Sequence, residues 1–203
     1  RLLSIYGSTE SSPHSLVRLN DTREHTEETD GCAVDGVEIR VVDDNRHEVP
    51  HGQEGEEASR GPQVFVGYWG EPEMTARALD ADGWYYSGDY CRMDSEGRYI
   101  RITGRKKDII VRGGENISSR EVEDIVLEYP GVREAAVVAM PDERLGERSC
   151  ACVSMRPGAP AMHLTDLVAF FDGRRVAKYK FPEYLVVLDA LPRTSSGKLQ
   201  KFA

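Results

Sequence analysis

The chain has 203 residues, of which 39% are hydrophobic and 30% charged, and its formal net charge is −9. This length allows one or two domains with a real core, and the acidic balance argues against non-specific nucleic-acid binding. No run of eighteen or more apolar residues occurs, so the sequence predicts no membrane-spanning helix.

The charge is unevenly distributed along the chain. Residues 1–60 carry 6 basic and 14 acidic side chains, whereas residues 104–203 carry 16 and 14. A mildly basic C-terminal half is compatible with a polyanionic small ligand. The four cysteines form no CxxC motif and no metal-ligand spacing with the five histidines. We therefore expect reduced cysteines in a cytoplasmic protein.

The first part of the chain predicts mostly β-structure. Residues 1–10 are interpreted as a buried strand followed by a loop, and because the chain starts inside this strand without Met, we expect it to be a fragment. Residues 11–30 are polar without a sustained period, which is typical of an irregular surface segment. Residues 34–42 alternate and lead into a turn at 43–45, which predicts a hairpin.

The β-rich pattern continues to about residue 103. Short strands are predicted over 54–58, 63–66 and 99–103, because turn residues separate these stretches. Residues 71–79 predict one helix between them. The pattern therefore indicates a small β-rich unit.

The pattern changes over residues 104–123. Residues 109–111 are β-branched and favour a strand, while Gly113 and Gly114 permit positive φ angles and a tight turn. A charge cluster, a strand, a turn and a helix start thus follow one another without a spacer. We interpret this segment as a junction between two parts of the chain.

Alternating helices and strands follow the junction. Ser118, with Glu121 three residues later, is a capping-box signature and predicts a helix that ends before Pro130. A second helix is predicted over 164–171, with Thr165 as its cap. Strands are predicted over 134–140, 149–155 and 184–188. The fold class is therefore α+β after the junction.

Five motifs, in this order, resemble the adenylate-forming (AMP-binding) superfamily of acyl-CoA synthetases, aryl-CoA ligases, luciferases and peptide-synthetase adenylation domains. They are Tyr6-Gly7-Ser8-Thr9-Glu10, Gly67-Tyr68-Trp69, Ser87-Gly88-Asp89, the segment 104–123, and Pro192-Arg193-Thr194-Ser195-Ser196-Gly197-Lys198. The resemblance covers essentially the whole chain. The segments 55–62 and 142–148 are most similar to bacterial short-chain and medium-chain fatty acyl-CoA ligases.

The resemblance implies a domain organisation. Residues 1–106 correspond to the β-rich end of the large N-terminal AMP-binding domain. Residues 107–203 correspond to the small, mobile α+β C-terminal domain of the acetyl-CoA synthetase-like fold. Lys107 occupies the hinge position, and we expect its charge to keep it hydrated while the domain rotates.

The resemblance also implies an ATP site in the first motif. Tyr6 is expected near the adenine, Gly7 belongs to the same motif, and Thr9 is expected to contact a phosphate. Glu10 is the expected Mg²⁺ ligand, because a hard carboxylate suits a cation that keeps several waters. A motif this short, taken alone, is more often an ordinary strand end.

Three charged residues complete the expected adenylation site. Asp89 and Arg105 match the family's ribose-binding positions, although either is also a candidate for a structural ion pair. Lys198 matches the catalytic lysine that bridges the carboxylate and the α-phosphate, as a mobile point charge would. The alternative without a catalytic role is a solvated lysine near a chain end. A P-loop is excluded because Pro192 and Leu199 occupy the positions of its first Gly and its Ser/Thr.

The remaining expectations concern CoA and aromatic residues. The resemblance implies that the turn at Gly113 and Gly114 approaches the pantetheine arm of CoA after the domain rotates. A basic run over 174–180 is either a contact for the CoA 3′-phosphate or a solvated helix end. The aromatic residues Trp69, Trp84, Tyr85 and Tyr86 are expected to pack in a core or between domains rather than to form a binding surface.

The resemblance implies an ATP-dependent acyl-CoA ligase. It would activate a short-chain or medium-chain fatty acid, or a similar acid, as acyl-AMP and transfer the acyl group to CoA, with ATP, Mg²⁺ and CoA as cofactors. We expect the fragment not to adenylate alone and to bind no nucleic acid, while oligomeric state and peripheral membrane contact stay open. The alternatives are an adenylation domain that loads a carrier-protein thiol, an aryl or alicyclic acid-CoA ligase, and a non-catalytic scaffold of the same fold.

Overall fold

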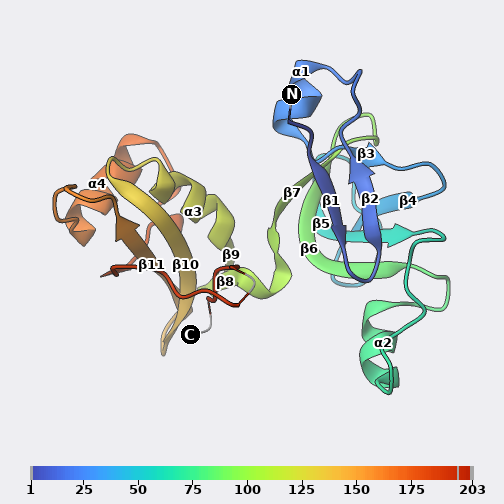
Figure 1. Cartoon of the computed structure of the whole chain (residues 1–203). Coiled ribbons are helices and arrows are strands. Elements are labelled where there is room, and N and C mark those ends of the chain that lie inside the picture. The colour runs from blue at the N-terminus through green and yellow to red at the C-terminus, as the bar shows by residue number, and fades with distance from the viewer. Residues whose placement is uncertain (1, 196, 202–203) are drawn as a thin grey trace. The chain divides into compact units, whose positions relative to one another are not determined.

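The computed structural model describes residues 2–195 and 197–201. The chain divides into two compact units, which we call unit 1 (Arg1–Lys106) and unit 2 (Lys107–Ala203). Figure 1 shows the elements of both units in chain order. Each unit has a sheet and a hydrophobic core of its own, so each is described separately.

Unit 1 is built from two antiparallel sheets. The first has the strand order β1 (Ile5–Ser8), β2 (Ser12–Leu16) and β3 (Cys32–Ala33). The second has the order β4 (Glu38–Val42), β5 (Glu54–Arg60), β6 (Tyr85–Met93) and β7 (Ile100–Arg105). The β1–β2 hairpin lies across β5 and β6 (Figure 1), and hydrogen bonds from both of its strands reach the second sheet.

The core of unit 1 lies on the four-stranded sheet in two small clusters. One consists of Val41, Cys91, Met93 and Ile100, and the other of Val42, Ala58, Trp84 and Tyr86. Val41 and Val42 are successive residues of β4 and belong to different clusters, because successive residues of a strand face opposite sides of the sheet. The pairings of β5 with β6 and of β6 with β7 each contain one irregularity, next to Glu57 and to Tyr90.

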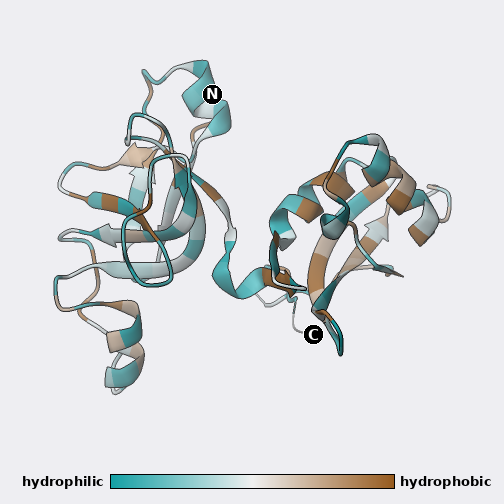
Figure 2. Cartoon of the chain, turned by 180° about the vertical axis from the view of Figure 1, so that it is seen from behind, coloured by the Kyte–Doolittle hydropathy of each residue, from teal (hydrophilic) through white to brown (hydrophobic). Residues whose placement is uncertain are grey.

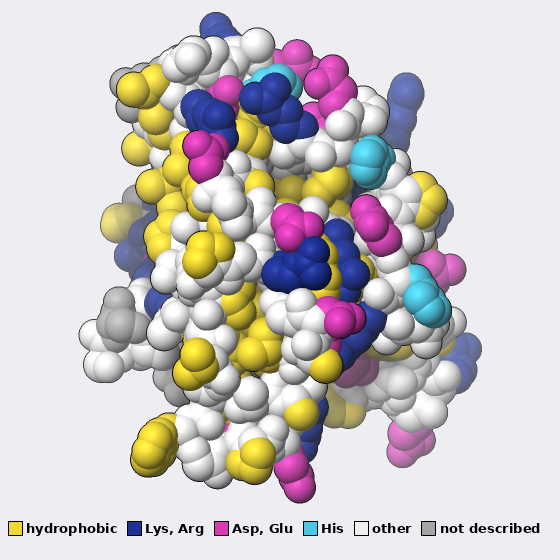
Figure 3. Space-filling view, turned by 90° about the vertical axis from the view of Figure 1, so that its right-hand side faces the viewer, with side chains coloured by type: hydrophobic (Ala, Val, Ile, Leu, Met, Phe, Trp, Pro, Cys, Tyr) yellow, Lys and Arg dark blue, Asp and Glu magenta, His cyan; other side chains and the backbone are white. Residues whose placement is uncertain are grey.

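The two helices of unit 1 are short and bury no residue. They are α1 (Arg23–Glu28) and α2 (Pro72–Ala78), and α1 is hydrophilic along its whole length (Figure 2). Large hydrophobic side chains of unit 1 are also exposed, among them Ile5, Val66, Trp69 and Met74. Figure 3 shows hydrophobic side chains exposed over one face, mixed with charged ones.

Unit 2 contains a five-stranded sheet. Its order is β10 (Val132–Asp142), β11 (Gly146–Met155), β8 (Ile109–Arg112) and β9 (Glu115–Ser118), and β12 (Tyr184–Val187) pairs in parallel with β11. The hairpin of β10 and β11 pairs continuously from Asp142 opposite Gly146 to Glu134 opposite Ser154.

The helices of unit 2 close its core. They are α3 (Ser119–Leu127) and α4 (Leu164–Gly173), with a short 3₁₀ turn at Lys178–Lys180. A second 3₁₀ turn, Lys106–Asp108, spans the boundary between the two units. Val122 and Val126 of α3 and Leu167 and Phe171 of α4 join strand residues in one hydrophobic cluster. Figure 2 shows hydrophobic and hydrophilic residues alternating around these helices, as expected for helices that cover a sheet.

Most predicted elements of unit 2 are confirmed. The Ser118 hydroxyl accepts a hydrogen bond from the Glu121 amide, so the predicted cap of α3 is correct. The predicted cap of the second helix is wrong, because α4 begins at Leu164 and His163 is its cap, which places Thr165 inside the first turn. Strand β9 was not predicted, since four residues directly before a helix give no separate strand signal.

Unit 1 departs further from the predictions. Residues 11–30 are not irregular, because β2 and α1 lie within them. Residues 63–66 form no strand, since Gly61, Pro62 and Gly67 break the backbone on both sides. The nine-residue strand β6 was missed, and β1 is not buried, because Ile5 lies on its exposed side.

Two further observations concern the whole chain. Across the described residues, we find no helix that combines the length and the apolar character needed to cross a membrane. All four cysteines are free thiols.

Candidate adenylate-binding site

Three predicted residues of unit 1 meet on neighbouring strands. The Tyr6 hydroxyl donates a hydrogen bond to Asp89 Oδ2 at 3.0 Å, and Arg105 Nε lies 3.2 Å from Asp89 Oδ1. The register of the sheet places Asp89 directly opposite Arg105 on β6 and β7. The Asp89 carboxylate is therefore held on both oxygens, while the Arg105 side chain stays 57% exposed.

The hydrogen bond between Tyr6 and Asp89 needs a protonated phenol. Burial raises the pKa of Tyr6 far above its ordinary value of 10.0, and the nearby negative charges of Glu57 and Asp89 act in the same direction. Tyr6 is therefore a hydrogen-bond donor at every physiological pH, so the contact persists.

The turn between β1 and β2 carries Thr9 and Glu10. Thr9 is exposed at its tip, whereas Glu10 is half-buried and its Oε1 accepts a hydrogen bond from the Tyr68 hydroxyl at 2.9 Å. The Glu10 carbonyl also accepts a hydrogen bond from the Phe65 amide at 2.7 Å. The first and second family motifs are thus joined at this turn.

Gly7 is required by the close approach of the two strands. A Cβ atom at this position would lie 2.3 Å from the Ser12 carbonyl oxygen and 2.6 Å from the Pro13 Cα atom. Backbone atoms cannot yield as a flexible side chain can, so a larger residue would displace β2. The glycine of the motif therefore has a structural reason here, separate from any ligand.

Glu10 has the surroundings of a single carboxylate ligand to Mg²⁺ rather than those of a metal site built from several protein side chains. Within the described residues, no group of three or more His, Cys, Asp or Glu side chains could hold a metal ion. Mg²⁺ commonly takes one or two carboxylates, together with water and the phosphates of a nucleotide. A single half-buried carboxylate beside the exposed Thr9 matches that pattern.

Glu56 ties the Asp89 segment to strand β5. The Gly88 amide donates to Glu56 Oε1 at 3.0 Å, and Lys106 Nζ contacts Glu56 Oε2 at 2.9 Å and Asp44 Oδ1 at 2.8 Å. Burial disfavours the charge on Lys106, but these two carboxylates outweigh it and raise the pKa of the lysine. The end of unit 1 is therefore fixed next to the candidate site.

The predicted residues of unit 2 lie at turns. Gly113 and Gly114 join β8 to β9 with φ angles of 59° and 91°, which is typical of a two-residue hairpin turn with positive φ at both positions. The Gly113 amide donates to the Leu145 carbonyl at 2.7 Å. A Cβ atom at Gly114 would have no atom within 4 Å, so this glycine faces open space.

Lys198 lies in a tight, exposed loop of unit 2. Its amide donates to Thr194 Oγ1 at 3.1 Å, and its carbonyl accepts from the Thr194 amide at 2.8 Å. Arg193 pairs with Leu199 across this loop, and Gly197 has a φ angle of 83°. These hydrogen bonds join the backbones of Thr194 and Lys198, while the Lys198 side chain is exposed.

The other unit 2 residues of the sequence analysis have identifiable surroundings. Lys107 is exposed in the 3₁₀ turn that begins unit 2. In the basic run, Arg174 pairs with Glu128 and Lys180 pairs with Glu121. Two of the four basic residues of the run thus pair within unit 2, and both alternatives, a contact for the CoA 3′-phosphate and a solvated helix end, stay predictions.

Sequence reasoning missed several residues that hold these segments. In unit 2, Lys201 Nζ lies 2.7 Å from Glu123 Oε1 and 3.0 Å from Ser119 Oγ, so it anchors the C-terminal loop to the start of α3. In unit 1, the missed residues are Glu56 and the buried pair of His14 and Glu57. The one available signal was the period of β5, which places Glu57 on the same face as its buried neighbour Gly55.

Three of the four aromatic residues behave as predicted. Trp84, Tyr85 and Tyr86 are buried, which confirms that they pack in a core, whereas Trp69 is 100% exposed, so packing in the core of unit 1 is excluded for it and packing between domains stays a prediction. Trp69 follows a glycine and precedes a turn, so no strand carries its side chain inward.

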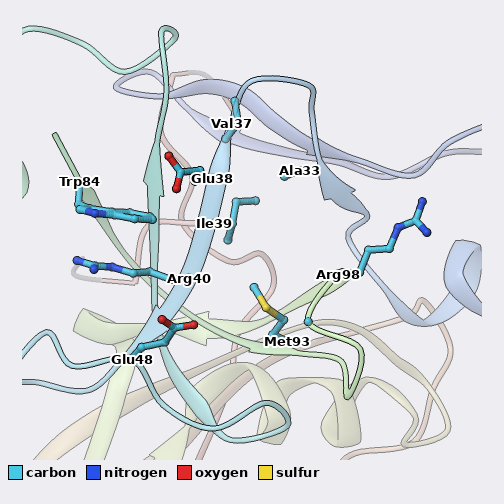
Figure 4. Close-up of a pocket in the computed structure, with 10 residues that line it drawn as sticks. Ala33, Val37, Glu38, Ile39, Arg40, Glu48, Trp84, Met93 and Arg98 are labelled. Atoms are coloured by element: carbon cyan, nitrogen blue, oxygen red, sulfur yellow. The ribbon is translucent and has the colours of Figure 1, made fainter. Parts of the chain in front are cut away.

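A separate pocket lies on strand β4. It has a volume of about 430 Å³, and its walls include Arg40 and Trp84, which stack at 4.0 Å (Figure 4). No predicted site residue lines it; the lining residues are Ala33, Val37, Glu38, Ile39, Arg40, Glu48, Trp84, Met93, Gly97 and Arg98. The pocket is therefore distinct from the site around Asp89.

Two family models match the chain. The model described as "AMP-binding enzyme" matches residues 1–69, and the model described as "AMP-binding enzyme C-terminal domain" matches residues 121–198. The chain belongs to the AMP-binding enzyme family, which confirms the resemblance seen in the sequence.

Individual relatives agree. The medium-chain fatty-acid–CoA ligase of Escherichia coli (strain K12) is 66% identical over 202 residues, which cover 100% of this chain and 36% of that ligase. The human mitochondrial medium-chain acyl-CoA ligase ACSF2 is 38% identical, over 99% of this chain and 32% of the relative. The chain thus spans about a third of the length of these relatives.

Solved structures confirm the fold. ATP-bound MatB from Rhodopseudomonas palustris matches 98% of this chain, and 39% of its own, with a TM-score of 0.91 and 35% identity. The o-succinylbenzoate CoA synthetase MenE from Bacillus subtilis, in complex with an acyl-adenylate intermediate, matches 98% of this chain and 40% of its own with a TM-score of 0.86 and 29% identity. The α+β class and the acetyl-CoA synthetase-like fold are therefore correct.

Proposed function

We propose that this chain is the C-terminal part of an ATP-dependent acyl-CoA ligase. The enzyme activates a short-chain or medium-chain fatty acid, or a similar carboxylic acid, as acyl-AMP and then transfers the acyl group to the thiol of CoA. The observation that carries the proposal is the meeting of Tyr6, Asp89 and Arg105 beside the exposed Thr9 turn. The exposed hydrophobic side chains of unit 1 also support the proposal, because they are suited to pack against another part of the enzyme.

In this proposal, unit 1 binds the nucleotide. The Asp89 carboxylate accepts hydrogen bonds from the ribose hydroxyls, and the exposed guanidinium of Arg105 donates to the same sugar. Tyr6 lies near the adenine, and Thr9 donates to a phosphate oxygen. Glu10 would hold Mg²⁺, which would neutralise phosphate charge when bound.

Unit 2 supplies the residues for the two chemical steps. Lys198 brings a positive charge to the α-phosphate and the substrate carboxylate, two anions that otherwise repel each other. Rotation about Lys107 then exchanges Lys198 for the turn at Gly113 and Gly114, whose open side admits the pantetheine arm of CoA. The Lys198 side chain is exposed, as such an exchange requires.

The test is CoA-dependent formation of AMP by the full-length enzyme with carboxylic acids of increasing chain length and with aryl, alicyclic and amino acids. A maximum among short-chain or medium-chain fatty acids, with a CoA thioester as product, is the expected result. A maximal rate with aryl or alicyclic acids would mean that these acids, and not fatty acids, are the substrate class. Adenylate formation without any CoA thioester would assign the enzyme to loading of a carrier-protein thiol instead, and absence of adenylate with every acid would leave a non-catalytic scaffold.

Two lesser parts of the proposal follow from the sequence. A cytoplasmic location agrees with the four free thiols. The 203-residue chain by itself is expected not to adenylate, because it spans about a third of its relatives' length. Release of pyrophosphate by the purified chain with ATP and the acids above would contradict that expectation.

A further inference from the structure

A buried pair of charged residues lies beneath the β1–β2 hairpin. His14 on β2 and Glu57 on β5 are both 0% exposed, and His14 Nε2 lies 3.1 Å from Glu57 Oε1. The contact joins the three-stranded sheet to the four-stranded sheet of unit 1. The roles proposed above for nucleotide binding use neither residue.

The partners of the pair define its protonation. His14 Nδ1 lies 3.0 Å from the Ser12 carbonyl oxygen, and His14 Nε2 faces the Glu57 carboxylate. A carboxylate only accepts hydrogen bonds, so Nε2 carries a proton. Nδ1 carries a second proton when it donates to the Ser12 carbonyl, and the Ser11 hydroxyl, 2.9 Å from Nδ1, can act as an acceptor in that state. Glu57 Oε2 is buried without a hydrogen-bond partner among the described residues, so the carboxylate needs the positive imidazolium beside it.

The surroundings maintain this charge state. Burial disfavours the charged imidazole, but the hydrogen bond and charge of Glu57, with the Ser12 carbonyl, raise the pKa of His14 above 6.5. Tyr6 on β1 and Cys91 on β6 also lie near the pair, and burial raises the pKa of each, so both stay neutral. Asp89 on β6 is already paired with Arg105.

His14 closes the turn that carries Thr9. Ser12 has a φ angle of 51°, in the left-handed region that non-glycine residues rarely adopt, and its carbonyl is the one that faces His14 Nδ1. The Ser11 hydroxyl lies 2.9 Å from the same nitrogen and 3.1 Å from Ser8 Oγ. The turn from Ser8 to Ser12 is therefore fastened to the imidazole.

Glu57 and His14 also support the Asp89 segment. The Ser87 hydroxyl donates to the Glu57 carbonyl at 3.0 Å, and the Asp89 amide donates to Ser87 Oγ at 3.1 Å. The Tyr6 ring meets the His14 ring edge-on, with centroids 5.1 Å apart, and its hydroxyl reaches Asp89. The Ser87 bond reaches the main chain of Glu57, so the ion pair itself contacts the Asp89 segment through the Tyr6 ring.

We propose that the His14–Glu57 ion pair positions the nucleotide site by holding the Ser8–Ser12 turn and the Ser87–Asp89 segment in register. A buried ion pair adds little stability over a well-packed apolar pair, but its hydrogen bonds specify one geometry. The link to the nucleotide rests on the function proposed above, whereas the ordering of the two segments does not.

The test begins with ¹⁵N-histidine NMR and amide hydrogen exchange on the 203-residue chain. The His14 ring is expected to show both nitrogens protonated and to titrate above pH 6.5. In Glu57→Gln its titration midpoint falls, and exchange at the Ser11 and Asp89 amides rises at least tenfold. The Ile100 amide, which donates to the Gly31 carbonyl, serves as the internal reference and stays protected. His47→Gln, at an 80% exposed side chain, is the control and changes none of these amides.

A second variant separates positioning from filling of the core. His14→Val with Glu57→Leu replaces the ion pair by an apolar pair, and a normal exchange rate at Ile100 shows that it folds. We expect Ser11 and Asp89 to remain at least tenfold less protected, because the turn loses its hydrogen bonds to His14 and Tyr6, which holds Asp89, loses the ring it packs against. Native protection of both amides in this variant would overturn the proposal.

The full-length enzyme then tests the link to the nucleotide. In the same double variant, the KM for ATP is expected to rise at least fivefold while the KM for CoA is unchanged, a split that general destabilisation would not produce. Lost protection with an unchanged KM for ATP would overturn the link to the nucleotide. If the unmodified enzyme uses no ATP at all, the proposed function fails, and the exchange result still decides whether the pair orders the two segments.

Discussion

At the scale of single residues, the side chain of Lys198 offers a sharp separation of the two proposed steps. Lys198→Ala is expected to lower adenylation by the full-length enzyme at least a hundredfold, about the effect of removing a group that stabilises developing charge. Transfer from supplied acyl-AMP to CoA should change little, because in the proposed rotation Lys198 has left the site before this step. The measurement is pyrophosphate release for the first step and thioester formation for the second.

The control for this variant lies in the same loop. Gln200 is exposed two residues away, and Gln200→Ala keeps the backbone hydrogen bond from its amide to the Pro192 carbonyl. It should leave both steps unchanged. If Lys198→Ala lowered both rates equally, this result would contradict the proposal that unit 2 rotates between adenylation and thioester formation.

Glu183 makes a pH-dependent contribution to the stability of unit 2. It accepts hydrogen bonds from Arg112 at two distances of 2.9 Å and from Arg148 at 2.9 Å, and its side chain is 20% exposed. The hydrogen bonds of Arg112, more than the opposing burial, lower the pKa of Glu183 below its ordinary value of 4.5. Its stabilisation is therefore complete above pH 4.5 and is lost as the pH falls through the lower pKa of the folded state.

Glu183→Gln tests this contribution. We expect it to lower the free energy of unfolding of unit 2 by about 1–2 kcal/mol at pH 7 and by less at pH 3, because pH 3 lies below the pKa of the unfolded state and the advantage of the charged carboxylate has begun to fall. Urea unfolding at the two pH values measures the difference. A loss of the same size at both values would mean that shape rather than charge matters here.

At the scale of elements, the start of α3 depends on one hydroxyl. Ser118→Ala removes the acceptor of the Glu121 amide and is expected to destabilise unit 2 by about 1 kcal/mol. Ser118→Asp should retain most of the stability, because aspartate is also a good cap. Arg120→Ala, at an exposed position of the first turn, should change the stability by less than about 0.5 kcal/mol. Denaturant unfolding compares the three, and equal stability of Ser118→Ala and the native chain would refute the role of the cap.

The elements that were predicted correctly carry local signals. The cap at Ser118, the glycines at 113 and 114 and Pro72 at the start of α2 each act on the backbone within a few residues. The missed elements lack such signals. Strand β6 contains Gly88 at a φ angle of 71° and two pairing irregularities around it, so its hydrophobic residues do not alternate regularly.

The candidate site could be predicted only in part for the same reason. The residues of the motifs were found by resemblance, but the contact of Tyr6 with Asp89 spans 83 positions of the sequence, and that of His14 with Glu57 spans 43. No local pattern encodes a pairing between two sheets. His14 stood in a segment interpreted as irregular, and its burial follows from the way the hairpin crosses β5.

At the scale of the whole molecule, the two units have separate cores. The cluster around Phe171 draws only on residues of unit 2 among the described residues, and the clusters around Cys91 and Tyr86 draw on unit 1. Phe171 is 0% exposed and packs against Phe181 with ring centroids 5.5 Å apart. Damage to one core should therefore not propagate through the other.

Phe171→Ala tests this independence. Loss of a buried aromatic ring is expected to lower the stability of unit 2 by about 3–5 kcal/mol. Hydrogen exchange at the Val137 amide, which donates to Glu123, should accelerate by at least a hundredfold, while exchange at the Ile100 amide of unit 1 should not change. Acceleration of both amides would show that the units unfold as one body. Such coupling would conflict with a C-terminal unit that rotates during the reaction, because a unit that turns between two arrangements must keep its own fold in both.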